Sequence, residues 1–246
     1  MFDLADKVVL VTGAAGGIGK ATALLLAKHG AKALVMTDVR KEPLEKSADE
    51  IKAETGVETL CIDGNLISEE FDKKLVEETV KVFGSLDVLV NCAGISRAGD
   101  IYSVNEQQWD LTFNINVKGL FFLCRAAFVA MEKQGGGSII NLSSQAGRAG
   151  GILVTPDYPS SKAAVLTLTK SLAKAGAAKG IRVNSVSPGL IATEMTATYN
   201  YDPTTVPLGR IGTGEDVAGA ILFLASEYAS YITGACIDVN GGIAMI

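Results

Sequence analysis

The fold is decided by the stretch VLVTGAAGGIGKA, residues 9–21. It runs from an apolar, strand-like segment through a glycine-rich turn into the start of an amphipathic helix. Glycines let the backbone of such a turn approach a phosphate closely, and the following helix offers free N–H groups and the positive end of its dipole. Since the motif stands in the strand-to-helix context that it requires, we expect a pyrophosphate site here rather than a tight turn without a ligand.

Short apolar segments alternate with longer amphipathic ones along the rest of the chain. The short segments are apolar nearly throughout, as strands buried on both faces are. The expected strands are KVVLVT (7–12), ALVMTD (33–38), ETLCI (58–62), DVLVN (87–91), SIINLS (138–143), RVNSVS (182–187) and ACIDV (235–239). The expected helices cover residues 17–30, 41–55, 68–84, 105–133, 160–180 and 214–229. The series predicts an α/β Rossmann fold, with a doubly wound seven-stranded parallel sheet, helices on both faces and one domain over residues 1–246.

Asp38 ends the second expected strand, about twenty residues after Gly19, where dinucleotide-binding folds place an acidic residue. A carboxylate there accepts hydrogen bonds from the ribose hydroxyls of the adenosine and repels a 2′-phosphate. Glycines, not basic residues, stand before the last glycine of the turn. We therefore expect NAD rather than NADP as the cofactor. Arg40 could reach a 2′-phosphate, but a solvent-facing position at the start of the next helix fits it better.

Charge and composition exclude several classes of function. The chain has 246 residues, 48% of them hydrophobic and 20% charged, with a formal net charge of −5. It carries no basic patch, so we expect no nucleic-acid partner. The N-terminal residues lack a basic segment followed by a long apolar stretch, and no apolar run approaches ~18 residues, so we expect neither a signal peptide nor a membrane span.

Cysteine and histidine are too sparse for a metal centre. The four cysteines lie far apart in apolar segments, and His29 is the single histidine. We expect no zinc site and no Ser-His-Asp triad. The cysteines fit buried free thiols in the reducing cytoplasm.

The stretch DYPSSK, residues 157–162, holds Tyr158 and Lys162 one helical turn apart, so both side chains can share a helix face. The pattern is common by chance and fits equally well the polar start of a helix. Pro159 suits a first helical turn, and Asp157 is expected to cap the helix by pointing at the backbone.

Several further motifs occur in an order that resembles the classical short-chain dehydrogenases/reductases over essentially the whole chain. The matching stretches are TGAAGGIG (12–19), GNLIS (64–68), NCAG (91–94), WDLTFNINVKGLFF (109–122), INLSSQAG (140–147), YPSSK (158–162) and SPGLIATEM (187–195). Two departures stand out. Ser144 and Tyr158 are fourteen positions apart, one more than usual, and the segment between SPG and PLGRIG is shorter than in many members.

The resemblance implies four catalytic residues: Asn116, Ser144, Tyr158 and Lys162. It implies cofactor contacts at Gly13, Ala15, Gly17, Ile18, Gly19, Asp38, Asn65, Leu66, Asn91, Ala93, Gly94, Tyr158, Lys162, Pro188, Gly189, Ile191 and Thr193. It also implies that Lys162 binds the nicotinamide ribose and that Asn116 orders a water for proton relay.

The expected chemistry is hydride transfer between a nicotinamide and a carbon bearing oxygen. A free phenol, with a pKa near 10, is a poor base. We expect the Lys162 ammonium and the helix start to lower the pKa of Tyr158, which then acts as general acid/base. Ser144 is expected to hold the substrate oxygen against Tyr158.

The leading hypothesis is an NAD-dependent oxidoreductase that interconverts a secondary alcohol and a ketone. The tail ITGACIDVNGGIAMI resembles that of 3-oxoacyl-acyl-carrier-protein reductases, an alternative that usually comes with NADPH. A non-catalytic dinucleotide sensor is a further alternative. By resemblance we expect a homotetramer.

Substrate-facing positions by the same resemblance are Ser96, Gln145, residues 152–155 and the segment after Met195. Arg97 and Arg148 could pair with an anionic substrate, or could be surface arginines.

Overall fold

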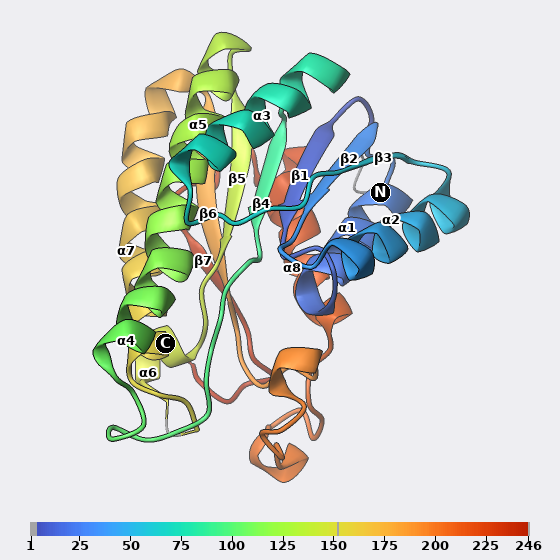
Figure 1. Cartoon of the computed structure of the whole chain (residues 1–246). Helices are drawn as coiled ribbons and strands as arrows, with labels where there is room; N and C mark the ends of the chain where they lie inside the picture. Colours follow the sequence, from blue (N-terminus) through green and yellow to red (C-terminus); the bar gives the residue numbers. More distant parts are fainter. Residues whose placement is uncertain (1–3, 152, 246) are drawn as a thin grey trace.

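A single seven-stranded sheet forms the centre of the molecule in the computed structural model, which describes residues 4–151 and 153–245 (Figure 1). All neighbouring strands pair parallel, in the order β3-β2-β1-β4-β5-β6-β7. The strands are β1 (Val8–Thr12), β2 (Ala33–Thr37), β3 (Glu58–Cys61), β4 (Val88–Asn91), β5 (Gly137–Leu142), β6 (Ile181–Pro188) and β7 (Cys236–Val239). The predicted doubly wound sheet is confirmed.

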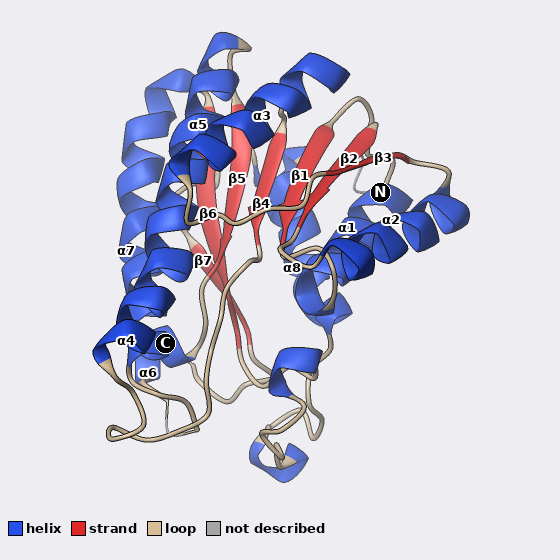
Figure 2. Ribbon diagram, in the orientation of Figure 1, coloured by secondary structure: helices blue, strands red, loops and turns tan. Residues whose placement is uncertain are grey.

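Helices cover both faces of this sheet (Figure 2). They are α1 (Gly17–Lys28), α2 (Lys41–Thr55), α3 (Glu69–Phe83), α4 (Glu106–Phe113), α5 (Leu120–Lys133), α6 (Ala146–Ala149), α7 (Asp157–Gly176) and α8 (Gly214–Ala225). Helices α1, α2 and α8 share one apolar core, and α3, α5 and α7 share the other. Alternate strand residues supply the two cores: Val9 and Val11 face the first, and Leu10 faces the second. This two-sided burial explains why β1 is apolar throughout.

The two outer strands depart from that pattern. Residues of β7 and most of β3 are only partly buried, and Glu58 of β3 is exposed, because each strand lies at an edge of the sheet. All four cysteines are free thiols, as expected, but Cys124 alone is fully buried.

The long helix expected over residues 105–133 is divided. A π-helical segment, Asn114–Gly119, separates α4 from α5. Contrary to the expectation from the sequence, the run Glu106–Lys133 is long and apolar enough to cross a membrane, judged by length and composition alone, and 33% of its most apolar stretch is buried. In this fold it lies beside the sheet, where α5 packs against α3 and α7 contacts the π-helical segment.

The start of α7 differs from the sequence-based expectation. Pro156, not Asp157, stands at the N-cap position, and no side chain caps the helix. Asp157 is 1% exposed, accepts a hydrogen bond from the Thr112 hydroxyl and lies 3.5 Å from the Arg97 guanidinium. The carboxylate therefore fastens α7 to α4, and Arg97 balances its charge. Arg97, which also donates to Thr112 at 3.0 Å, is a structural partner and not a free cation for substrate.

Replacing Asp157 tests this anchor. Asp157→Ala should lower the free energy of unfolding by roughly 2–3 kcal/mol, somewhat less than for a fully buried pair, because Arg97 is partly exposed. Urea denaturation of this variant, of Arg97→Ala and of the double variant gives the coupling between them. The double variant should lose clearly less free energy of unfolding than the two single variants lose together. A loss equal to that sum would show that Asp157 and Arg97 do not interact.

Asp72 is a second buried carboxyl group, on the inner face of α3. Its side chain is 1% exposed, and neither of its oxygens has a hydrogen-bond partner among the described residues. Burial, with a smaller contribution from the Glu69 charge, raises the pKa of Asp72 from 3.8 to about 7. Below about pH 7, the Asp72 carboxyl group is therefore mostly protonated and neutral in the folded chain.

The raised pKa of Asp72 predicts a pH-dependent stability. Between its two pKa values the unfolded chain binds fewer protons than the native one, so stability falls as pH rises from about 4 to about 7. Asp72→Asn removes this titration. Its free energy of unfolding relative to the wild type, from urea denaturation, should therefore increase between about pH 4 and pH 8. If the difference in free energy of unfolding between Asp72→Asn and the wild type stayed constant across this range, Asp72 would not have a raised pKa in the folded chain.

Candidate active site

A cavity of about 990 Å³ lies at the carboxyl ends of the strands, where the loops after β1, β2, β4, β5 and β6 meet. Strand order reverses between β1 and β4, the point at which open parallel sheets bind ligands. The cavity is lined by these predicted site residues: Gly13, Gly17, Ile18, Gly19, Asp38, Asn65, Leu66, Ala93, Gly94, Ser144, Tyr158, Lys162, Pro188, Gly189, Ile191 and Thr193.

Two positions of the glycine-rich turn leave no room for a side chain. Gly13 has a φ of +65°, and a Cβ atom there would lie 2.9 Å from the backbone nitrogen of Ala93. A Cβ atom on Gly19 would lie 2.2 Å from the Gly13 carbonyl oxygen. The first turn of α1 carries no acidic residue of its own, and Gly17, Ile18 and Gly19 of this turn line the cavity at the positive end of the helix dipole. This cradle fits a dinucleotide pyrophosphate.

Asp38 lies in the cavity wall just beyond the end of β2. Its carboxylate accepts hydrogen bonds from the backbone nitrogens of Ala15 at 3.3 Å and Arg40 at 3.0 Å. These bonds fix the carboxylate near the glycine-rich turn, where it can accept from ribose hydroxyls.

Lys162 is a buried ammonium group. Its side chain is 4% exposed, and Nζ donates to the Leu142 carbonyl oxygen, at the end of β5, over 2.8 Å. Burial lowers the pKa of Lys162 to about 8. A Cβ atom at Gly94 would lie 3.1 Å from Asn116 Oδ1 and 3.3 Å from Lys162 Nζ, so the loop after β4 passes close to both side chains.

Tyr158 and Ser144 both lie on the cavity wall. Burial raises the pKa of Tyr158, and the nearby Ser144 hydroxyl only partly offsets this rise. The Lys162 ammonium lies 5.9 Å from the ring centroid. The expected lowering of the pKa of Tyr158 is therefore wrong for this geometry, because the loss of hydration outweighs the lowering effect of Ser144.

Asn116 lies within the π-helical segment and does not line the cavity. Its amide accepts from the Ile95 backbone nitrogen at 2.9 Å and donates to the Ile95 carbonyl and the Ser161 hydroxyl, each at 3.0 Å. The widened helical turn thus ties the loop after β4 to α7. The sequence assigned no role to Ser161. Its hydroxyl accepts the hydrogen bond from Asn116 and donates to the Tyr158 carbonyl at 2.7 Å. The position of Ser161 between Tyr158 and Lys162 in the sequence could have indicated a role in positioning them.

Two predicted cofactor residues do not line the cavity. The Asn91 side chain is 3% exposed and donates to Asn141 at 2.8 Å, inside the sheet. Ala15 reaches the site only through its backbone bond to Asp38. Thr12 was missed as a site-shaping residue: its hydroxyl accepts from the Ala93 nitrogen at 3.0 Å and holds the loop after β4 against β1.

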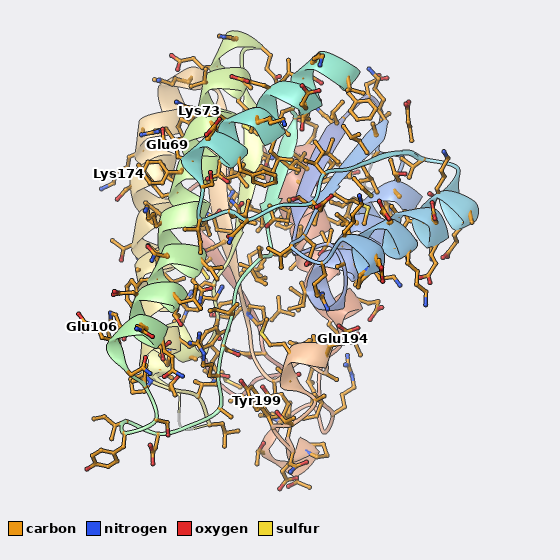
Figure 3. The ribbon with its side chains drawn as sticks, viewed as in Figure 1. Glu69, Lys73, Glu106, Lys174, Glu194 and Tyr199 are labelled. Carbon is orange, nitrogen blue, oxygen red and sulfur yellow. The ribbon has the colours of Figure 1, made fainter. Side chains whose placement is uncertain are left out.

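The substrate end of the cavity is covered by the segment after β6. Tyr199, labelled in Figure 3, lies with its hydroxyl 3.0 Å from that of Ser96, and its ring packs edge-on against Tyr201. Gln145, Leu153 and Val154 also line this end, whereas Ile152 lies outside the described residues.

Arg148, a candidate partner for an anionic substrate, is engaged elsewhere. Its guanidinium lies 3.2 Å from the Asp238 carboxylate on β7. Arg148 is therefore paired within the chain, and it does not line the cavity.

Comparison with known proteins agrees with this geometry. A family model described as Enoyl-(Acyl carrier protein) reductase matches residues 13–244. A curated 3-oxoacyl-[acyl-carrier-protein] reductase FabG from Staphylococcus aureus is 43% identical over 244 residues, covering 97% of this chain and 98% of that protein. The reductase of the same name from Thermotoga maritima is 42% identical over 248 residues, covering 98% and 99%.

Solved structures give the same result. A short-chain type dehydrogenase/reductase from Mycobacterium marinum superposes with a TM-score of 0.95 at 36% identity, covering 100% of this chain and 98% of that one. A putative short-chain alcohol dehydrogenase from Sinorhizobium meliloti gives a TM-score of 0.92 at 35% identity, covering 98% of each chain. With matched motifs, sheet order and full-length similarity, the chain belongs to the classical short-chain dehydrogenase/reductase family.

Proposed function

We propose that this oxidoreductase reduces the ketone of a 3-oxoacyl thioester held on an acyl carrier protein, with NADH as the reductant. The similarity to 3-oxoacyl-[acyl-carrier-protein] reductases over nearly the whole chain favours this substrate over an unspecified secondary alcohol. The observation that carries the proposal is the placement of Ser144, Tyr158 and the buried ammonium of Lys162 on the wall of the same cavity as the glycine-rich turn.

The side chains suit ketone reduction. A reduced dinucleotide bound in the cavity supplies hydride to the ketone carbon. Ser144 donates a hydrogen bond to the ketone oxygen and stabilises its developing charge. Tyr158 then gives its proton to that oxygen. The raised pKa of Tyr158 keeps the phenol protonated at neutral pH, as an acid requires, and Lys162 stabilises the phenolate that remains.

The cofactor assignment rests on Asp38. The similarity to 3-oxoacyl-acyl-carrier-protein reductases favours NADPH, whereas a fixed carboxylate beside the glycine-rich turn favours NADH. We give more weight to the local charge, because a 2′-phosphate would have to approach this carboxylate directly.

Removal of the phenolic hydroxyl tests the chemistry. Tyr158→Phe should lower turnover of a 3-oxoacyl thioester with NADH by about 10²- to 10⁴-fold, because the proton donor is lost. Tyr231→Phe, at a fully exposed position, is the matched control and should keep wild-type turnover. NADH fluorescence should still report cofactor binding to Tyr158→Phe.

Two outcomes would contradict the proposal. Undiminished turnover by Tyr158→Phe would exclude Tyr158 as the proton donor. Reduction of a 2-enoyl thioester without reduction of the 3-oxoacyl thioester would exclude the ketone as the substrate group.

Cofactor choice is tested by binding alone. Fluorescence titration of the wild-type protein should give a Kd for NADH about tenfold or more below that for NADPH, because the Asp38 carboxylate repels the added phosphate. In Asp38→Ser, which lacks this charge, the Kd for NADPH should lie closer to the Kd for NADH. Tighter binding of NADPH by the wild type would overturn the NADH assignment.

We further propose that the chain assembles into a homotetramer. Apolar side chains remain exposed on the outer side of α4 and α5: Val129 is 55% exposed, Leu111 39% and Trp109 38%. These residues support burial against a second copy. Small-angle scattering should give the mass of four chains, and a monomer at micromolar concentration would refute the proposal.

A further inference from the structure

Glu194 crosses from the segment after β6 to the adenosine side of the cavity. It begins the short 3-10 helix Glu194–Thr196, and Figure 3 shows it at the side of this segment nearer to α1 and α8. Its carboxylate lies 3.1 Å from the guanidinium of Arg40, a residue 154 positions away in the sequence. Glu194 and Arg40 therefore join the segment after β6 to the loop that follows β2.

Arg40 is held by two carboxylates. Its Nε donates to Asp38 at 3.3 Å while its Nη1 donates to Glu194. The hydrogen bond to Glu194 is the largest of the effects that raise the pKa of Arg40, followed by those of Asp38. Two negative charges thus share one positive charge, and the group carries a net charge of −1.

The carboxylate of Glu194 also approaches the glycine-rich turn. A Cβ atom on Gly16 would lie 3.3 Å from Glu194 Oε2. Gly16, Asp38, Arg40 and Glu194 all line the cavity, so the charged group lies where the adenosine ribose would approach Asp38. A phosphate on the ribose 2′ position would need a cation here.

Arg40 is the cation available for that role. Of the described residues that line the cavity, Arg40 and Lys162 carry a basic side chain, and Lys162 is buried beside Tyr158. As long as Glu194 binds the Arg40 guanidinium, a 2′-phosphate meets two carboxylates and a cation that is already paired.

We propose that Glu194 is a specificity-determining residue for the cofactor. It binds Arg40 and so withholds from a 2′-phosphate the cation that would otherwise bind it. Discrimination against NADPH then depends on Glu194, in the segment after β6, as well as on Asp38. The inference deepens the NADH preference proposed above and rests on the same site.

The test is fluorescence titration of NADPH and NADH with Glu194→Gln, which keeps the shape of the side chain and removes its charge. NADPH affinity should rise about two- to fivefold, because the Arg40–Glu194 pair is exposed and such pairs are worth ~0.2–1 kcal/mol, while NADH affinity changes less than about 1.5-fold. Glu132→Gln is the matched control, because Glu132 is an exposed partner of Lys179 outside the cavity lining and its loss changes the net charge equally. It should leave both affinities unchanged.

The double variant Arg40→Gln/Glu194→Gln identifies the mechanism. If Glu194 acts by occupying Arg40, the gain in NADPH affinity disappears in the double variant relative to Arg40→Gln. A gain that persists without Arg40 would overturn the proposal in favour of direct repulsion by Glu194, and no gain in Glu194→Gln would overturn it outright.

The outcome is separable from that of the proposed function. Wild-type preference for NADPH would refute the NADH assignment, yet an Arg40-dependent gain in Glu194→Gln would still support the role of Glu194. No acyl substrate enters the titration, so an incorrect substrate does not affect it.

Discussion

The parallel direction of all seven strands is the constraint on which the site depends. Parallel strands place all their carboxyl ends at one edge of the sheet, and the order β3-β2-β1-β4-β5-β6-β7 opens a crevice there between β1 and β4. Segments far apart in the sequence then meet in one cavity: the glycine-rich turn follows β1, Asp38 follows β2, Gly94 follows β4 and Ser144 follows β5. The same edge receives the segment after β6, which carries both Glu194 and Tyr199.

The start of α7 is held in place by contacts on two sides. Asp157 fastens it to α4 through Thr112 and Arg97. Ser161 fastens it to the loop after β4 through the Asn116 amide. Between these anchors, Lys162 reaches the end of β5. These bonds position the first turns of α7, which carry Tyr158 and Lys162, and the π-helical turn supplies the Asn116 amide for one of them.

Local patterns predicted the sheet and most helix boundaries, and the resemblance to the short-chain dehydrogenases/reductases implied most of the site residues that line the cavity. Apolar segments alternating with amphipathic ones specify the order of elements, and the motif spacing places Tyr158 and Lys162 on one helix face. Pairings between distant residues were beyond such patterns. Asp157 with Arg97, Arg148 with Asp238, and Arg40 with Glu194 are 60, 90 and 154 positions apart, so no local signal encodes them. The pKa of Tyr158 was also misjudged, because burial can be seen only in the folded chain.

Transfer of hydride to the 3-oxo carbon is the central claim, and isotope labelling tests it most directly. The protein is mixed with a 3-oxoacyl thioester and NADH that carries deuterium at both hydrogens on C4 of the nicotinamide, and the acyl product is analysed by mass spectrometry. The account predicts a 3-hydroxyacyl product with one deuterium on C3. A 3-hydroxyacyl product without deuterium, or a cofactor that is oxidised while the ketone stays intact, would contradict it.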